Sequence, residues 1–364
     1  MLHRRKIMNV LIVGLGYAGT RFVQAFSNIN KNIVGNEKIN IAYVDRSLKR
    51  SDIKYFEEID TAIKQFDPQI IVISVNDEFH MDVIKKLNGF KGFVICEKPL
   101  ANTHDDLELL EAKLSDISGF CLNLIERYSD ATIVLKKYVE EHDLRLIRAN
   151  FYWGKNRIND HRPTCGVISE IIHPLDLIQW ICAPNSDLEL KSIQGTRSDF
   201  SISGPEVLDS VAVTAYLGRA VVTGYSSFVN IVRKREVDLV FASPQNKLIF
   251  ATMVFDTPVW DIDHLRIWER TSSGEHVIMD MKTSIDDSNP GLKTVRKLVR
   301  LVNDVTGYVL NGTVPSQPFA CLQTALRLQK LLNTIEHNAT TIGPVQYVVG
   351  PKREIYSDEN DWER

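Results

Sequence analysis

The chain lacks the cysteine and histidine patterns of metal-binding and disulfide-bonded proteins. Its cysteines are odd in number and far apart, and neither a C-x-x-C pair nor an H-E-x-x-H motif occurs. These cysteines are Cys96, Cys121, Cys165, Cys182 and Cys321. Dispersed thiols are typical of a reducing compartment, so we expect free cysteines, a cytoplasmic location and no bound metal.

Long apolar runs and an excess of charge of one sign are also missing. The 364 residues carry 43 basic and 46 acidic side chains, which gives a net charge of -3. The basic start, residues 3–6, precedes an apolar run over 7–13 that is too short to span a membrane. We therefore expect neither a membrane nor a nucleic acid as partner.

The first third of the chain contains a regular alternation of short apolar strands and helices. We expect strands at 8–13, 39–44, 70–75, 93–96 and 119–124, and helices at 18–28, 57–65, 80–87 and 107–114. This alternation specifies a parallel sheet with helices on both faces. The predicted class is α/β, with a doubly wound Rossmann domain over residues 1–123.

The pattern changes after this segment. Residues 124–338 hold many strands at short spacing, a helix at 131–141 and two late helices at about 292–310 and 319–336. We predict an α+β domain with a large, mainly antiparallel open sheet. Residues 339–364 are expected to form a polar C-terminal tail.

A glycine-rich turn follows the first expected strand. Gly14, Gly16 and Gly19, with Tyr17 and Ala18 between them, form a G-x-G-x-x-G pattern that opens a helix. In a dinucleotide site these glycines permit the tight turn, the approach of the pyrophosphate and close helix packing. The turn therefore predicts a dinucleotide cofactor, although a glycine turn that serves packing alone is the alternative.

An acidic residue ends the second expected strand. The Asp45 carboxylate can accept hydrogen bonds from ribose hydroxyls, which favours NAD over NADP. Arg46 and Ser47 come directly afterwards and could hold a 2′-phosphate if Asp45 turned away. NAD is the predicted cofactor, with NADP possible.

Three further motifs complete an ordered set. Residues 74–80 (SVNDEFH) end one strand, 97–99 (EKP) end the next, and 173–176 (HPLD) open an apolar helix in the second domain. In this order and at these distances they resemble the glucose-fructose oxidoreductase and inositol dehydrogenase family, over residues 8 to about 336. The family's strand-end pattern T-P-N-x-x-H is matched at Asn76, while Val75 replaces its proline and His80 lies one position late.

The resemblance implies roles for several side chains. Ser74, Asn76 and Glu97 would contact the cofactor, and Lys98 would lie beside the nicotinamide and the substrate. An ammonium there stabilises the alkoxide that develops as a hydride leaves. An imidazole side chain can both take and return a proton, so His173 would exchange the hydroxyl proton.

The usual pattern around this histidine, G-G-x-x-x-D-x-G-x-H-x-x-D, is incomplete. Ser169 stands where the family often has an aspartate, and it is predicted to contact the substrate instead. Glu170, one position out of register, or Asp176, one helical turn after the histidine, could supply the missing carboxylate. Which carboxylate supports His173 stays open at this point.

A loop rich in hydrogen-bond donors precedes the histidine helix. Arg157 and Arg162 are candidates to bind a carboxylate or phosphate of the substrate, together with Lys155 and His161. A solvated loop is the alternative.

These observations predict a metal-free, NAD(P)-dependent dehydrogenase or reductase acting on a secondary hydroxyl or ketone. The expected substrate is a sugar, a cyclitol or a sugar derivative, including nucleotide-activated or anionic ones. The resemblance implies that residues 124–338 bind the substrate and that their open sheet mediates assembly into a homodimer or homotetramer. Two alternatives remain, a dinucleotide-binding regulator without turnover and a reductase of C=N or C=C bonds on the same fold.

Overall fold

The structure is a computed structural model of residues 1–364, and it describes residues 7–32, 38–158, 163–283 and 294–347. The chain divides into two compact units. The first comprises Met1–Ile125 and Ser288–Lys330, and the second comprises Glu126–Asp287 and Leu331–Arg364. The division at Ile125 lies close to the predicted end of the first domain, residue 123.

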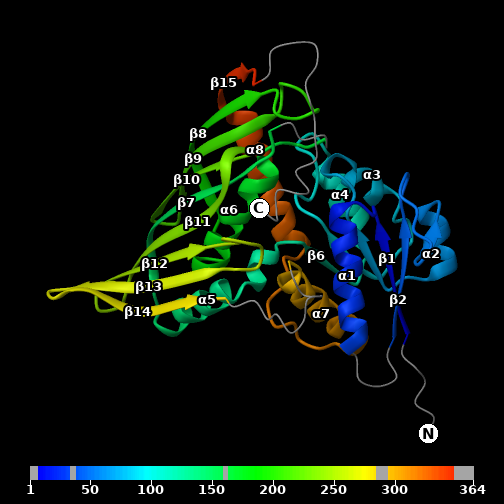
Figure 1. The fold of residues 1–364 in the computed structure, drawn as a ribbon, viewed down its shortest axis with the longest axis horizontal. Helices are drawn as coiled ribbons and strands as arrows, with labels where there is room; N and C mark the ends of the chain where they lie inside the picture. The colour runs from blue at the N-terminus through cyan, green and yellow to red at the C-terminus, as the bar shows by residue number, and fades with distance from the viewer. Residues whose placement is uncertain (1–6, 33–37, 159–162, 284–293, 348–364) are drawn as a thin grey trace, which may run out of the picture. The chain divides into compact units, whose positions relative to one another are not determined.

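The first unit is built on a six-stranded parallel sheet in the order β3-β2-β1-β4-β5-β6 (Figure 1). Its strands are β1 (Ile7–Val13), β2 (Lys38–Val44), β3 (Lys54–Phe56), β4 (Ile70–Ile73), β5 (Phe93–Cys96) and β6 (Gly119–Leu122). The helices between them are α1 (Tyr17–Asn32), α2 (Ile59–Phe66), α3 (His80–Lys85) and α4 (Leu107–Leu114), with the short η1 (Asp77–Phe79) before α3. The central strands are fully buried apolar segments, as a sheet covered on both faces requires. The predicted Rossmann architecture is confirmed.

A late segment of the chain belongs to this first unit. Helix α7 (Arg296–Asn311) packs against α1, and a guanidinium nitrogen of Arg21 donates a hydrogen bond to the carbonyl of Thr294. Sequence periodicity predicts the helix but not its partner, because an amphipathic face fits any apolar surface. The division at Lys330 falls within α8 (Leu322–Asn338).

The second unit contains a nine-stranded mixed sheet in the order β14-β13-β12-β11-β7-β10-β9-β8-β15. Its strands are β7 (Arg145–Asn156), β8 (Leu188–Ser198), β9 (Leu208–Leu217), β10 (Ala220–Ser227), β11 (Val229–Ala242), β12 (Leu248–Val254), β13 (His264–Thr271), β14 (Gly274–Lys282) and β15 (Thr340–Val345). Six of the eight pairings are antiparallel, and β7 with β10 and β8 with β15 are parallel. The predicted, mainly antiparallel sheet is confirmed.

Helices of the second unit lie against this sheet. These are α5 (Asp130–Glu141), which follows the short η2 (Ile125–Tyr128), and α6 (Ile168–Cys182), which packs on α5, β7 and β10. Helix α6 begins five residues before His173, so the motif HPLD lies inside it rather than at its start. Pro174 has no backbone N–H, which favours the first turn of a helix, but here it lies inside α6.

Two strands of this sheet do not follow from a hydrophobic pattern in the sequence. Residues 188–198 form β8, whose alternation of buried and exposed side chains is weak, and residues 340–345 of the expected tail form the edge strand β15. All six residues of β15 are exposed, so the sequence contains no hydrophobic pattern that would predict this strand.

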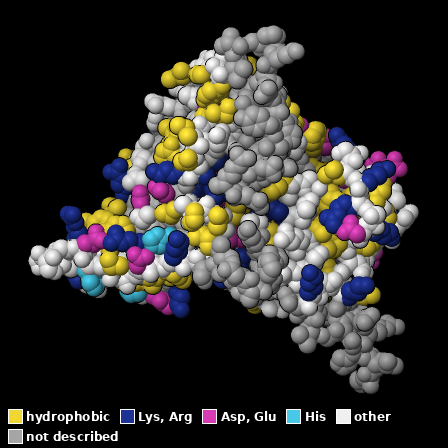
Figure 2. Space-filling model, viewed as in Figure 1, with side chains coloured by type: hydrophobic (Ala, Val, Ile, Leu, Met, Phe, Trp, Pro, Cys, Tyr) yellow, Lys and Arg dark blue, Asp and Glu magenta, His cyan; other side chains and the backbone are white. Residues whose placement is uncertain are grey.

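Charged side chains of both signs are interspersed on the face drawn in Figure 2. Helices in the described ranges are too short or too polar to cross a membrane. The five cysteines are unpaired, as expected.

Candidate active site

The glycine turn between β1 and α1 leaves no room for side chains at two of its three glycines. Gly14 has a φ of +91°, and a Cβ there would lie 2.7 Å from the nearest backbone nitrogen. A Cβ on Gly19 would lie 2.0 Å from the carbonyl oxygen of Gly14. At Gly16 no atom lies within 4 Å of such a Cβ. Tyr17 and Ala18 start α1 beside this open space, so first-turn amides and open room for a pyrophosphate occur together.

Asp45 ties the end of β2 to this turn. One carboxylate oxygen accepts the N–H of Leu15 at 2.6 Å, and the other accepts those of Ser47 at 2.9 Å and Leu48 at 2.8 Å. Burial alone would raise the pKa of the Asp45 carboxyl, but these backbone donors outweigh it and lower the pKa. The side chain is therefore an ionised acceptor that is partly occupied by the backbone.

Side chains after β2 and β4 surround the same turn. The Ser74 hydroxyl donates a hydrogen bond to the carbonyl of Gly14 at 2.8 Å, which stabilises the turn. Asn76 is exposed, and the exposed Arg46 guanidinium lies 5.0 Å from the centre of the Phe79 ring. Asn76 and Arg46 are thus the solvent-facing members of this predicted set.

The EKP motif follows β5 and is tethered on both sides. The Asn123 amide donates to the Glu97 carboxylate at 2.6 Å. His80, the buried first residue of α3, places Nδ1 2.8 Å from the carbonyl oxygen of Pro99. Lys98 between them is half-buried, and the Lys98–Pro99 peptide bond is cis.

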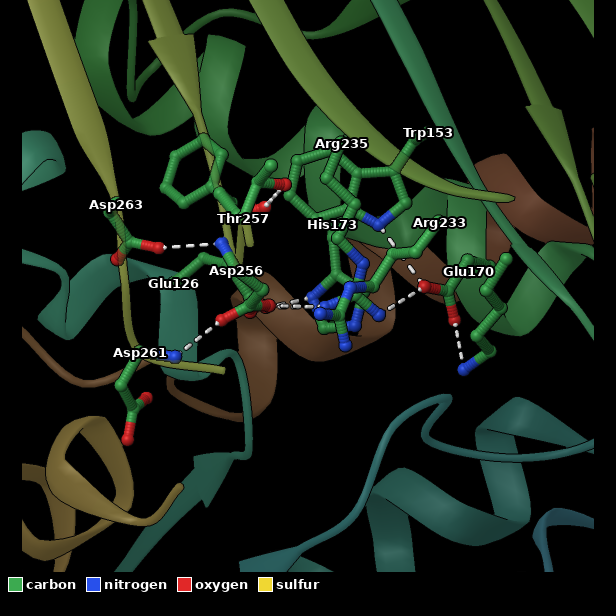
Figure 3. Close-up of polar contacts among 12 residues, drawn as sticks. Glu126, Trp153, Glu170, His173, Arg233, Arg235, Asp256, Thr257, Asp261 and Asp263 are labelled. Atoms are coloured by element: carbon green, nitrogen blue, oxygen red, sulfur yellow. Dashed lines mark hydrogen bonds and ion pairs between the residues drawn. The ribbon is translucent and has the colours of Figure 1, made fainter. Parts of the chain in front are cut away.

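His173 lies in the second unit within a buried group of charged side chains (Figure 3). Its Nδ1 is 2.9 Å from a carboxylate oxygen of Glu126, in η2, and both side chains are at most 6% exposed. The two groups are within ion-pair distance without the alignment of a hydrogen bond. The indole of Trp153, in β7, stacks on the imidazole with an interplanar angle of 24°. Helix α6, strand β7 and the short helix η2 together fix the plane of the imidazole ring.

Glu170, one of the predicted relay carboxylates, is held elsewhere. One of its oxygens accepts the Trp153 indole N–H at 3.2 Å and Arg235 Nη2 at 2.7 Å. The other lies 2.8 Å from Lys155 Nζ. Glu170 is fully buried, and both of its oxygens face donors other than His173.

Arg235, in β11, is the central cation of this group. Its guanidinium contacts Glu170, donates to the carboxylate of Asp256 at 2.5 Å and lies 3.9 Å from Glu126. Burial alone would lower the pKa of Arg235, but the three carboxylates outweigh it and raise the pKa, so the residue stays charged. The Asp256 carboxylate in turn accepts the N–H of Asp261 at 3.0 Å.

Asp176, the other predicted carboxylate, forms a bidentate pair with Arg127. Nε donates at 2.8 Å and Nη2 at 2.5 Å, and both side chains are nearly inaccessible. This geometry joins α6 to η2. Asp176 lies one turn after His173, yet its oxygens are directed to the guanidinium.

Two residues predicted to bind the substrate, Arg157 and Ser169, make contacts within the protein. Arg157 packs its guanidinium 4.6 Å from the centre of the Phe228 ring, and Ser169 donates its hydroxyl to the carbonyl of Gly166 at 2.9 Å. Arg162 and His161 lie outside the described residues.

Sequence reasoning missed Glu126 and Arg235. Glu126 directly follows the apolar residues Leu124 and Ile125. A carboxylate buried beside apolar residues needs a cationic or hydrogen-bonding partner, so its position in the sequence was a usable signal. Arg235 stands among Arg233, Lys234 and Glu236, which resemble a solvated strand edge. No group of three or more potential metal ligands occurs among the residues placed with certainty.

Comparison with known proteins yields a matching family model and several similar structures. A family model described as "Oxidoreductase family, NAD-binding Rossmann fold" matches residues 8–115. The description of this model agrees with the resemblance that the motifs indicate for these residues. The resemblance inferred from the motifs is thereby confirmed.

Curated relatives of this family are distant. Inositol 2-dehydrogenase of Salmonella typhimurium is 21% identical over 182 residues, which cover 47% of this chain and 53% of the relative. The aligned part of the chain thus spans about half the length of the curated relatives that it matches.

Several solved structures share the fold over most of the chain. A levoglucosan dehydrogenase in complex with NADH has a TM-score of 0.70 at 14% identity, covering 92% of this chain and 97% of that one. A super-repressor mutant of Gal80p from Saccharomyces cerevisiae has a TM-score of 0.68 at 15% identity, covering 91% and 95%.

Proposed function

We propose that this protein is an NAD(P)-dependent dehydrogenase or reductase of a secondary hydroxyl or ketone on a sugar, cyclitol or sugar derivative. The observation that carries the proposal is the buried His173 held against Glu126, in a chain whose first unit has a dinucleotide turn and an intact EKP motif. The inositol dehydrogenase relatives and the levoglucosan dehydrogenase structure support this substrate class.

The first unit would hold the cofactor. Gly16 and the first turn of α1 would receive the pyrophosphate, and Asp45 would accept a ribose hydroxyl, which favours NAD. Arg46, exposed on Phe79, is the residue that would admit the 2′-phosphate of NADP. A bound nicotinamide supplies the hydride acceptor or donor.

The remaining chemistry is proton transfer and charge stabilisation by this chain. In the oxidation direction His173 takes the hydroxyl proton at Nε2, because Nδ1 faces Glu126. The Lys98 ammonium stabilises the oxyanion that forms as the proton leaves. In the reduction direction His173 returns the proton to the same oxygen.

A regulator that binds the dinucleotide without turnover is the second candidate. The tethering of Glu170 and Asp176 by guanidinium groups favours it, because both carboxylates predicted for the relay are engaged. The resemblance to the Gal80p fold is compatible with it.

The experiment is a turnover screen with a binding control. The purified protein is mixed with NAD or NADP and a panel of cyclitols, aldoses, sugar acids and sugar nucleotides, and reduced nicotinamide absorbance is followed. Calorimetry measures cofactor affinity in parallel. Turnover that Lys98→Met lowers by at least about a hundredfold, with affinity retained, supports the dehydrogenase. Cofactor binding without turnover in either direction supports the regulator.

A further inference from the structure

We infer that Glu126 is the carboxylate that positions His173. It takes the place of the aspartate that the family often has where this chain has Ser169, and Arg235 keeps Glu170 out of this role. The inference deepens the proposed function and rests on it for the reaction, but the contacts that carry it lie within the second unit. Glu126 comes from a short helix after β6 rather than from α6, which is why no motif around His173 reveals it.

The first step of the argument concerns which carboxylate reaches the imidazole. Glu126 places an oxygen 2.9 Å from Nδ1, whereas Glu170 directs one oxygen to Arg235 and Trp153 and the other to Lys155. Ser169 sits one turn before His173 on the same helix, but its hydroxyl donates to a backbone carbonyl. Glu126 is therefore the carboxylate at the imidazole.

The second step concerns what a carboxylate does at Nδ1. An ionised carboxylate only accepts hydrogen bonds, so the neutral imidazole beside it carries its proton on Nδ1 and presents a lone pair on Nε2. His173 has no other polar contact among the residues that the structure describes. The pair thus selects the tautomer that can take a proton at Nε2, and it stabilises the imidazolium that results.

The third step concerns Arg235. Its guanidinium binds Glu170 and Asp256 closely, at 2.7 and 2.5 Å, but lies 3.9 Å from Glu126. At this distance the guanidinium attracts one oxygen of the Glu126 carboxylate, and the second oxygen stays directed to His173. Because hydrogen bonds of a proton relay are often poorly aligned before substrate binds, the present alignment of the pair is compatible with this role.

The test reads the tautomer directly and needs neither cofactor nor substrate. Protein labelled with ¹⁵N on histidine is studied by long-range ¹H–¹⁵N correlation in the neutral form of the ring, and the His173 signals are assigned by their loss in His173→Asn. We expect wild-type His173 to be the Nδ1–H tautomer. A wild-type Nε2–H tautomer overturns the inference even if the Glu126 variants fail to fold.

Two variants separate positioning from stability. Glu126→Gln replaces a pure acceptor with an amide that can also donate, so we expect the Nε2–H tautomer to appear and kcat to fall about a hundredfold with KM changed less than threefold. Glu126→Asp keeps the charge and should retain the wild-type tautomer. Glu170→Gln is the matched control, because it changes an equally buried carboxylate of the same group without touching His173.

The inference fails if Glu126→Gln keeps the Nδ1–H tautomer, or if Glu170→Gln shifts the tautomer as much. A shifted tautomer in a protein that turns over nothing in the substrate panel supports the positioning role and contradicts the proposed function. The two claims are therefore tested separately.

Discussion

Trp153 and Arg235 face each other across neighbouring strands, and together they hold Glu170 from two sides. Arg235 in β11 is in register with Trp153 in β7, and its guanidinium lies 5.4 Å from the centre of the indole ring. The indole N–H and the guanidinium donate to the same oxygen of Glu170. The indole N–H and one guanidinium nitrogen thereby share a charged acceptor inside the buried core.

Gly16→Ala and Gly19→Ala should separate cofactor binding from folding. A methyl group at Gly16 meets open space in the protein, so we expect the free energy of unfolding to stay constant or rise by about 0.5 kcal/mol. The same methyl group would obstruct a pyrophosphate and weaken NAD binding at least about tenfold. Calorimetry and thermal unfolding measure the two effects.

Gly19→Ala is the paired variant. Its Cβ would lie 2.0 Å from a backbone oxygen, so we expect a loss of at least about 2 kcal/mol in the free energy of unfolding. Equal stability of Gly19→Ala and wild type would contradict the packing that we describe for the turn.

Asp45→Asn should destabilise the first unit in a pH-dependent manner. The pKa of Asp45 is lowered on folding, so the stabilisation is present above its ordinary value of about 3.9 and is lost as the pH falls through the lower folded value. We expect Asp45→Asn to lower Tm at pH 7, and this gap to narrow between pH 5 and pH 3. A gap that stays constant down to pH 3 would show that charge is not the cause.

The fold and the cofactor turn could be predicted because each depends on local signals. The alternation of apolar strands and helices specifies the Rossmann sheet, and the turn needs glycine at Gly14 and Gly19 for steric reasons that sequence spacing reveals. Partners that lie far apart in the sequence could not be predicted. Glu126 and His173 are 47 positions apart, and α7 packs on α1 across more than 250 residues.

The carboxylates of the candidate site show the same limit. Glu170 and Asp176 were chosen for their spacing from His173, which fixes proximity along a helix but not the direction of a side chain. Arg235 and Arg127, from β11 and η2, decide that direction by charge. Such competition between partners is a property of tertiary structure.

Arg127→Leu should destabilise the second unit strongly. The change leaves the buried Asp176 carboxylate without its bidentate partner, so we expect a loss of about 3–5 kcal/mol in the free energy of unfolding. Asp176→Asn leaves the buried Arg127 guanidinium without a counter-charge, so we expect a loss of the same order, reduced only by the one amide oxygen that can still accept a hydrogen bond. Urea denaturation of the apoprotein measures both.

An exposed pair of the same unit provides the comparison. Lys137 and Glu141 lie 3.6 Å apart on α5 with side chains 72% and 55% exposed, so Glu141→Gln should change stability by only about 0.5 kcal/mol. Equal effects of Arg127→Leu and Glu141→Gln would mean that the buried pair contributes nothing beyond a surface contact.

The most direct test of the account is the rate of nicotinamide reduction by His173→Ala on the substrate that the screen identifies. With cofactor affinity and Tm close to those of wild type, we expect kcat to fall by about 10²- to 10⁴-fold, because the proton acceptor is removed. Undiminished turnover by His173→Ala would contradict the role of His173 and of the carboxylate group built around it.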